Sequence, residues 1–355
     1  MKCLEQLNGI SYSNELVKKL SVLYTYKGKD IYFKSELSQV IKGIIKKTIG
    51  TDAIYASKIL NLDIKESRLN QIAYGDSNPR TKDEIILKNL KTIFTIIQEK
   101  GSQIEITDNE FWSLARRIFS DIKNVNFVQV KKIVKENLLD ETRYVSRRND
   151  VKDELKLFEK GLYYYEAIQL ITKFYVDILN EPIFDYENDF IALMIVYSLL
   201  KSQEFTALEC SSFFEIIYNK MDSLKVYKQK ASLNYSTGYS RTDELNEFLV
   251  DILLECYKQV EITVKNNKFD KNISLSKVNL VASGIMKLPD TFKKKDVKDM
   301  FPALSDSTIQ RALDELKAEN KIQSNGTGRS ATWTKISTND SFIGSNGQLT
   351  INFED

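Results

Sequence analysis

The sequence predicts a mainly α-helical protein with a large helical body and a small C-terminal module. Its 355 residues include only four prolines and thirteen glycines, a scarcity that favours long helices over a many-stranded sheet. Apolar side chains recur at helical spacing through most of the chain up to about residue 260. From about residue 278 the pattern changes to short helices followed by strand-like runs. A chain of this length can bury one large core and a smaller second one.

Composition removes several classes of function. The chain has no histidine, which is the commonest general base near neutral pH and the commonest transition-metal ligand. Cys3, Cys210 and Cys256 are scattered and form no CxxC pair, so we expect no disulfide framework and no thiolate metal site. We also expect no other metal site and no cofactor. The net charge is only +2, so any nucleic-acid binding must come from a local basic patch.

No membrane role is expected. The N-terminal segment lacks the uninterrupted apolar stretch of a signal peptide. The longest apolar run, from Phe190 to Leu200, is shorter than the roughly 20 residues that a bilayer-spanning helix needs. The cysteine usage and this pattern together predict a cytoplasmic protein.

Capping residues mark where helices of the body begin. Thr81 precedes acidic residues that suit the positive end of a helix, and Thr107 with Glu110 has the S/T-x-x-E spacing of a capping box. Further helices are expected at about 126–139 and 164–180, with an irregular polar segment at 141–154.

The run FIALMIVYSLL (190–200) is apolar on every side and predicts a helix in the middle of a bundle. An amphipathic helix at 242–260 closes the body. The polar segment 263–277, rich in lysine and asparagine, is expected to be a linker.

The C-terminal module follows a recognisable order of elements. NLVASGIMKLP predicts a first helix and KKKDVKDMF a second, and after a tight turn Ser305 caps a third, DSTIQRALDELKAEN, with Ile309, Leu313 and Leu316 as its apolar stripe. KIQSN and SATWTKI predict two strands joined by a glycine turn. This is the order of a winged helix-turn-helix domain.

Such a domain predicts DNA contacts from two groups of residues. The N-terminal half of the third helix would face the bases, and a lysine cluster with the wing tip would contact phosphates. The predicted DNA-binding residues are Lys293, Lys294, Lys295, Ser307, Thr308, Gln310, Arg311 and Arg329.

Two features of the module qualify or extend this prediction. Winged helices also serve as protein-interaction modules, and Asp314 and Glu315 would repel DNA if they faced it. The tail carries Asn346-Gly347 between two short strand-like runs, which predicts a C-terminal hairpin.

The body resembles the Fic-domain family, in the class with an N-terminal inhibitory helix and a C-terminal winged helix. TDAIYASKILNLD lies where that family has its S-x-I-E-G helix, and NPRTKDEIILKNLKTIF lies where it has P-x-T-x-x-E. ITDNEFWSLARRIF and the buried helix FIALMIVYSLL follow in the family's order. The resemblance covers roughly residues 14–336 and implies a Fic-like helical bundle.

The family's catalytic loop, H-P-F-x-[DE]-G-N-G-R, is degenerate in this chain. Without gaps it falls on residues 203–211, where only Phe205 agrees. The resemblance implies that these positions would otherwise supply a base, a metal-binding acid and an anion cradle for a nucleotide. The degenerate positions are Gln203, Glu204, Phe205, Ala207, Glu209 and Ser211.

The family's inhibitory glutamate is also missing, because its position reads Leu60 and the following glycine reads Asn61. A glutamate without its partner arginine would be a costly unpaired charge in a closed pocket. If the forfeited site has become part of the core, Leu60 and Leu208 are the residues expected to close it.

These observations predict four regions: an N-terminal helical region with the degenerate inhibitory helix (1–100), a degenerate Fic-like core (101–262), the linker (263–277) and a winged-helix domain with a hairpin tail (278–355). The preferred function is a non-catalytic regulator that binds DNA and uses its body for homodimerisation or partner binding. Two alternatives stay open: a divergent nucleotidyl- or phosphoryl-transferase acting on a protein hydroxyl, and a protein-interaction module without nucleic acid.

Overall fold

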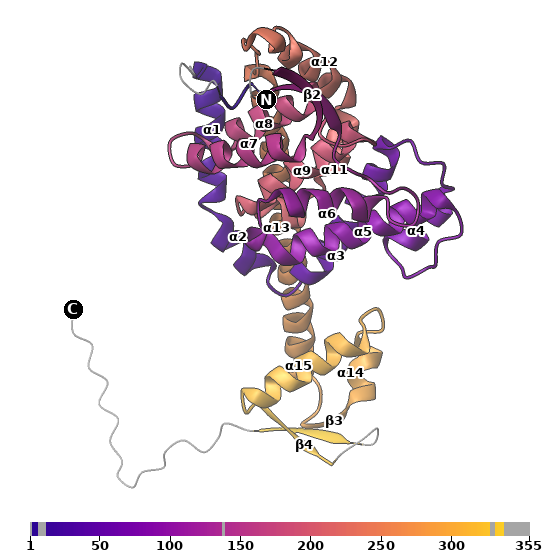
Figure 1. Cartoon of the computed structure of the whole chain (residues 1–355). Helices are drawn as coiled ribbons and strands as arrows, with labels where there is room; N and C mark the ends of the chain where they lie inside the picture. Colours follow the sequence, from indigo (N-terminus) through magenta and orange to yellow (C-terminus); the bar gives the residue numbers. More distant parts are fainter. Residues whose placement is uncertain (1, 6–11, 137–138, 327–330, 337–355) are drawn as a thin grey trace, which may run out of the picture. The chain divides into compact units, whose positions relative to one another are not determined.

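The computed structural model describes residues 2–5, 12–136, 139–326 and 331–336, with the backbone alone for 132–136, 139–142 and 269–276. The chain forms two compact units, unit 1 (Met1–Val264) and unit 2 (Lys265–Asp355). Each unit has its own apolar core. The predicted mainly helical fold is confirmed (Figure 1). No helix in the described ranges is both long enough and apolar enough to cross a bilayer.

Unit 1 is built from helices of very different lengths. In chain order they are α1 (Asn14–Lys27), α2 (Asp30–Leu37), α3 (Ile41–Ile59), α4 (Glu66–Ala73), α5 (Lys82–Lys100), the 3-10 turn η1 (Gly101–Gln103), α6 (Asp108–Ile118), α7 (Arg148–Gly161), α8 (Ala167–Asn180), α9 (Asn188–Ser202), α10 (Ala207–Cys210), α11 (Phe213–Asn219), α12 (Met221–Ser232), the 3-10 turn η2 (Tyr235–Thr237) and the first part of α13 (Asp243–Ile285).

The predicted helix caps are present. The Thr81 hydroxyl accepts from the backbone N–H of Glu84 at the start of α5, and the Thr107 hydroxyl accepts from Glu110 at the start of α6. Each cap satisfies one of the backbone N–H groups that the first turn of a helix leaves unpaired.

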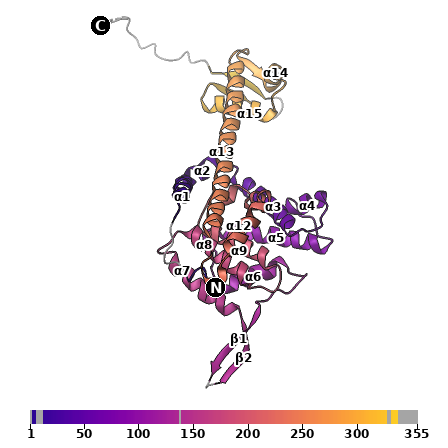
Figure 2. The same ribbon diagram turned by 90° about the horizontal axis from the view of Figure 1, so that it is seen from above.

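The helix predicted at 126–139 is wrong, and so is the irregular segment predicted at 141–154. β1 (Gln129–Glu136) and β2 (Leu139–Ser146) pair as an antiparallel hairpin with Gln129 opposite Ser146. The hairpin projects from the helices of unit 1 (Figure 2). α7 follows it directly. In the sequence QVKKIVKE, apolar and polar residues alternate too irregularly to distinguish a strand from a helix.

The segment predicted to be the linker, residues 263–277, is helical. These residues lie inside α13, which continues without a break from unit 1 into unit 2. The helix predicted at the start of the C-terminal module is the end of the same α13. The few apolar residues of this segment give little helical period, so its lysine and asparagine content dominated the sequence interpretation.

α9 lies at the centre of unit 1, as its composition predicts (Figure 1). Every residue from Phe190 to Lys201 is buried, and α9 packs against α5, α6, α8 and η1. The last turn of α9 therefore lies inside the bundle, and the chain that follows it starts from a buried position.

In unit 2 the second part of α13 is followed by β3 (Thr291–Lys293), α14 (Lys294–Met300), α15 (Asp306–Ala318), β4 (Ile322–Asn325) and β5 (Thr332–Lys335). The three strands form an antiparallel sheet in the order β3-β5-β4. The predicted stripe of α15 is buried in the core of this unit, together with Phe292 and Trp333. The predicted tail hairpin and Arg329 lie outside the described residues.

A buried carboxylate fixes residues 2–5 to unit 1. Asp177 on α8 is fully buried and accepts from the backbone N–H groups of Lys2, Cys3 and Leu4 at 2.7, 2.9 and 3.1 Å. The Tyr235 hydroxyl donates to it at 2.8 Å. Burial, and then the neighbouring Asp177, raise the pKa of Glu154 to about 10, so Glu154 stays protonated and donates a hydrogen bond to Asp177.

We expect Asp177→Ala to lower the free energy of unfolding by about 3 kcal/mol or more, because it leaves several buried donors without an acceptor. Denaturant unfolding followed by circular dichroism measures the change. The control is Asp222→Ala, whose side chain is fully exposed and whose loss should cost less than about 0.5 kcal/mol. Equal effects of the two variants would contradict this role of Asp177.

Candidate functional site

The candidate site is the segment of residues 203–211, which begins where α9 ends. Gln203 closes α9, and Glu204 then takes a left-handed backbone conformation with a φ of 59°. This turn directs Phe205 into the core, where it is 1 % exposed and lies edge-on to Tyr257. The segment is therefore packed into the protein from its third residue onward.

The rest of the segment forms α10, whose apolar side chains face the core. Ala207 and Leu208 are fully buried, and Cys210 is nearly so. The Leu208 carbonyl accepts from Gln98 Nε2 on α5 at 2.6 Å. α10 also packs against α3, the helix that ends at Ile59. Apolar packing and a backbone hydrogen bond thus hold α10 in place.

The carboxylate of Glu209 in this segment is already paired within the protein. Glu209 Oε1 lies 3.1 Å from Lys201 Nζ and 3.3 Å from Lys34 Nζ. Lys201 is only 2 % exposed. Burial lowers the pKa of Lys201, while Glu209 favours its charged form. Glu209 is thus the counter-ion of a buried lysine.

The polar residues at the two ends of the segment make ordinary hydrogen bonds. The Gln203 amide donates to Ser202 Oγ at 3.2 Å, and the Ser211 hydroxyl donates to Gln259 Oε1 on α13 at 2.5 Å. Neither group titrates near neutral pH, so neither can serve as a general base there.

A cavity of about 520 Å³ lies beside this segment. Its charged lining carries both signs: four lysines (Lys27, Lys34, Lys100, Lys201) and four carboxylates (Asp30, Glu99, Glu204, Glu209). Such a balanced lining does not supply the excess of donors and positive charge that a triphosphate requires.

The end of α3 keeps a regular shape at Leu60 and Asn61. Asn61 is left-handed with a φ of 54°. The N–H of Asn61 donates to the Lys58 carbonyl, and the N–H of Leu62 donates to the Ser57 carbonyl, both at 3.0 Å. This is the Schellman helix end, in which glycine is usual and asparagine is tolerated. Leu60 is partly buried against the core of unit 1.

Sequence reasoning missed Asp52 of α3, which is fully buried. Asp52 Oδ1 accepts from the Ser212 hydroxyl at 2.6 Å and from the Phe214 backbone N–H at 3.0 Å. Burial raises the pKa of Asp52 to about 7, although these hydrogen bonds favour its charged form. A carboxylate from α3 thus contacts the start of α11, directly after the candidate segment. An acidic residue within the apolar face of a predicted helix was the available signal.

Within the described ranges, no group of three or more cysteine, aspartate or glutamate side chains could hold a metal ion. Glu204 and Glu209 both line the cavity, but Glu209 is engaged by two lysines.

In unit 2 the structure brings together two of the predicted DNA-binding residues. Lys294 at the start of α14 donates to Gln310 Oε1 on α15 at 2.7 Å, and Gln310 donates to Asp314 at 3.0 Å. Ser307 and Arg311 of α15 are exposed, as are Lys293 and Lys295.

The start of α15 is capped as expected. The Ser305 hydroxyl accepts from the backbone N–H of Thr308 and lies 2.9 Å from both the Ser307 and the Thr308 hydroxyl oxygens. This cluster of three hydroxyls lies one helical turn before Arg311.

Comparison with known proteins shows similarity in fold only. No family model matches the sequence, and no curated protein matches it. The structure is similar to the crystal structure of a Fic family protein from Desulfovibrio desulfuricans G20, with a TM-score of 0.52 and 11 % sequence identity. The similarity covers 96 % of this chain and 99 % of that one. The chain therefore has a Fic-like, mainly helical fold.

The raised pKa of Asp52 makes stability depend on pH. A carboxyl group whose pKa is raised by folding stabilises the folded state fully below its unfolded pKa, and this contribution disappears as pH rises through the folded pKa. Between about pH 5 and pH 8 we expect the wild-type protein to lose about 2 kcal/mol more stability than Asp52→Asn, which cannot ionise. Urea unfolding at a series of pH values measures both slopes, and parallel slopes would refute the assignment.

Proposed function

We propose that this protein is a Fic-like regulator that transfers no nucleotide and binds DNA through unit 2. On this proposal unit 2 is a winged helix-turn-helix domain, and the helical body serves for homodimerisation or for binding a protein partner. The Fic-like fold supports the comparison of residues 203–211 with the family's catalytic loop.

One observation carries the non-catalytic part: the segment where a phosphate-binding loop would lie forms a packed helix. Leu208 is fully buried, and Glu209 adds a carboxylate that pairs with Lys201. A triphosphate bound beside this segment would meet Glu209 where the resemblance implies an anion cradle. Charge repulsion opposes such binding.

The DNA-binding part rests on the face formed by α14 and α15. Ser307 and Arg311 are exposed near the start of α15, and the exposed Lys293 and Lys295 flank Lys294 at the start of α14. A helix that presents hydroxyl and guanidinium groups beside lysines has the side chains that read base edges and bind phosphates.

We expect the full-length protein to shift a DNA fragment from its own upstream region, with affinity that falls steeply as salt is raised. Arg311→Gln should lower affinity for the preferred sequence by about tenfold and reduce discrimination between sequences. Lys295→Gln should weaken binding to all sequences alike and reduce the salt slope by about one.

Lys317→Gln is the matched control, because it removes one positive charge from the exposed far end of α15. Its affinity and salt slope should be those of the wild-type protein. Absence of any complex at low salt would defeat the DNA-binding proposal.

Transferase activity is tested separately. We expect no label on any protein when the purified chain is incubated with ATP labelled at either the α- or the γ-phosphate, magnesium and a cell lysate. Transferred label, absent when the protein is boiled first, would overturn the non-catalytic assignment and favour the divergent transferase.

A protein-interaction role for unit 2 is a second candidate, favoured by one contact. Asp314 accepts from Gln310, so a carboxylate shares the face that would read bases, where it would repel phosphate. Formation of a stable complex with a protein, unaffected by nuclease and by Arg311→Gln, would favour this candidate over DNA binding.

A further inference from the structure

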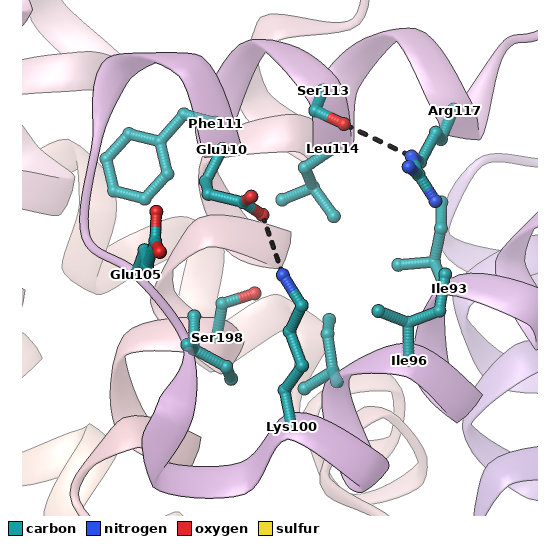
Figure 3. A pocket seen from close by; sticks show the side chains of 12 residues that line it. Ile93, Ile96, Lys100, Glu105, Glu110, Phe111, Ser113, Leu114, Arg117 and Ser198 are labelled. Carbon is teal, nitrogen blue, oxygen red and sulfur yellow. Dashed lines mark hydrogen bonds and ion pairs between the residues drawn. The ribbon is translucent and has the colours of Figure 1, made fainter.

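Two neighbouring hollows on unit 1, neither of them lined by residues 203–211, share one wall of α6. The first is a cavity of about 110 Å³ between α5 and α6 (Figure 3). Its apolar walls are Ile93, Ile96, Ile97, Ile104, Phe111 and Leu114. The side chains of α6 point toward those of α5 across this space, and Ser198 of α9 lies behind them (Figure 3).

The second hollow is wider and lies at the C-terminal end of α6. It has a volume of about 730 Å³ and is lined by Trp112, Arg116, Arg117 and Lys123, with Asp121 as its acidic residue. Ser113 and Arg117 line both hollows. An apolar cavity therefore opens beside a surface with an excess of positive charge.

We propose that these two hollows form one binding site for a small amphipathic anion, with a short aliphatic tail in the cavity and a carboxylate at Arg117. This inference does not depend on whether the protein binds DNA or transfers nucleotides. Apolar walls with a few polar groups at the mouth are typical of small-molecule sites.

The charges around the cavity fix the orientation of the ligand. Lys100 Nζ and Glu110 Oε2 form an ion pair at 3.3 Å across the space between α5 and α6, so the positive charge of Lys100 is already offset by a carboxylate (Figure 3). The exposed Glu105 lies at the same side and would repel an anion. Arg117 lies at the opposite end, away from Glu105 and the ion pair (Figure 3).

The arginines at that end are held by neutral groups. Arg117 Nε donates to Ser113 Oγ at 3.1 Å, and the Arg116 guanidinium lies 4.9 Å from the centre of the Trp112 ring. Within the described part of the chain no carboxylate forms an ion pair with Arg116 or Arg117. Both guanidinium groups keep donors that suit a carboxylate, to which arginine binds with two parallel hydrogen bonds.

The size of the cavity sets the length of the tail. An apolar cavity of about 150 Å³ holds one benzene-sized molecule. The cavity between α5 and α6 is smaller, so it has room for about four or five carbon atoms. Linear or singly branched carboxylates of that length are therefore the expected class.

The test uses isothermal titration calorimetry of the full chain with the sodium salts of acetate, butyrate, pentanoate, hexanoate and octanoate at constant ionic strength. Affinity should rise by about fourfold per methylene and stop rising once the cavity is full, at pentanoate or hexanoate. Pentanol and pentylamine are the head-group controls, and the amine should bind most weakly of the three five-carbon probes.

Two variants probe the two ends of the site. Arg117→Gln should weaken pentanoate binding by about tenfold and leave pentanol unchanged, whereas Leu114→Phe, which fills the cavity, should weaken both. Lys88→Gln is the matched control, because it removes one positive charge from an exposed position of α5 outside both hollows.

Three results would overturn the proposal: pentanoate binding no tighter than acetate, equal losses in Arg117→Gln and Lys88→Gln, or tighter binding of pentylamine than of pentanoate. Arg117 is exposed, so its substitution leaves the fold intact and the test stands even if Leu114→Phe does not fold.

Discussion

Helix α9 has apolar side chains on every side, and the architecture of unit 1 follows from the need to cover all of them. An amphipathic helix can turn its polar face to water, but α9 has no such face. Its neighbours α5, α6, α8 and η1 contact it directly, and its residues from Phe190 to Lys201 are buried. Because the helix ends inside the bundle, Lys201 in its last turn is buried too and requires a counter-ion there. Glu209 supplies it, and this pair fixes where α10 can lie.

The same constraint explains why charged groups in this core have defined partners. A buried charge is costly unless donors or an opposite charge compensate for its lost hydration. Asp177 is compensated by three backbone N–H groups, and Asp52 by a hydroxyl and a backbone N–H. Each of these carboxylates joins segments that are distant in the sequence. Loss of either carboxylate would leave its buried donors without an acceptor, so these contacts favour the arrangement in which the segments meet.

The sequence predicted those parts of the fold whose signals are local. The apolar run of α9, the caps at Thr81, Thr107 and Ser305, and the stripe of α15 are all set by residues within one helix. The β1–β2 hairpin was missed because it is stabilised by pairing between two segments. The hydrophobic pattern of either segment alone does not reveal that pairing. The continuous α13 was missed because the polar segment 263–277 resembles a loop in composition.

The candidate site shows the same division between local and non-local signals. Sequence reasoning located residues 203–211 from the helix that precedes them. It did not find Asp52 or the Lys201–Glu209 pair, because each contact depends on a second segment brought close by folding. The two hollows beside α6 were missed for the same reason, since α5 and α9 supply part of their walls.

Asn61 and Glu204 show that a turn can keep its backbone conformation without the residues that nucleotide binding would require. Both residues are left-handed, at φ values of 54° and 59°. Asparagine adopts this region readily, whereas glutamate does so at a cost of about 1 kcal/mol. The end of α3 therefore keeps its shape without glycine, and the turn after α9 is formed with some backbone strain.

A nucleotide site needs more than such turns, because backbone N–H groups must point at an unoccupied space. After α9 the following residues instead form α10, whose Leu208 is buried in the core of unit 1. On the proposed function, the protein keeps a Fic-like fold, while the segment after α9 is packed as a helix and the cavity beside it has a lining of balanced charge.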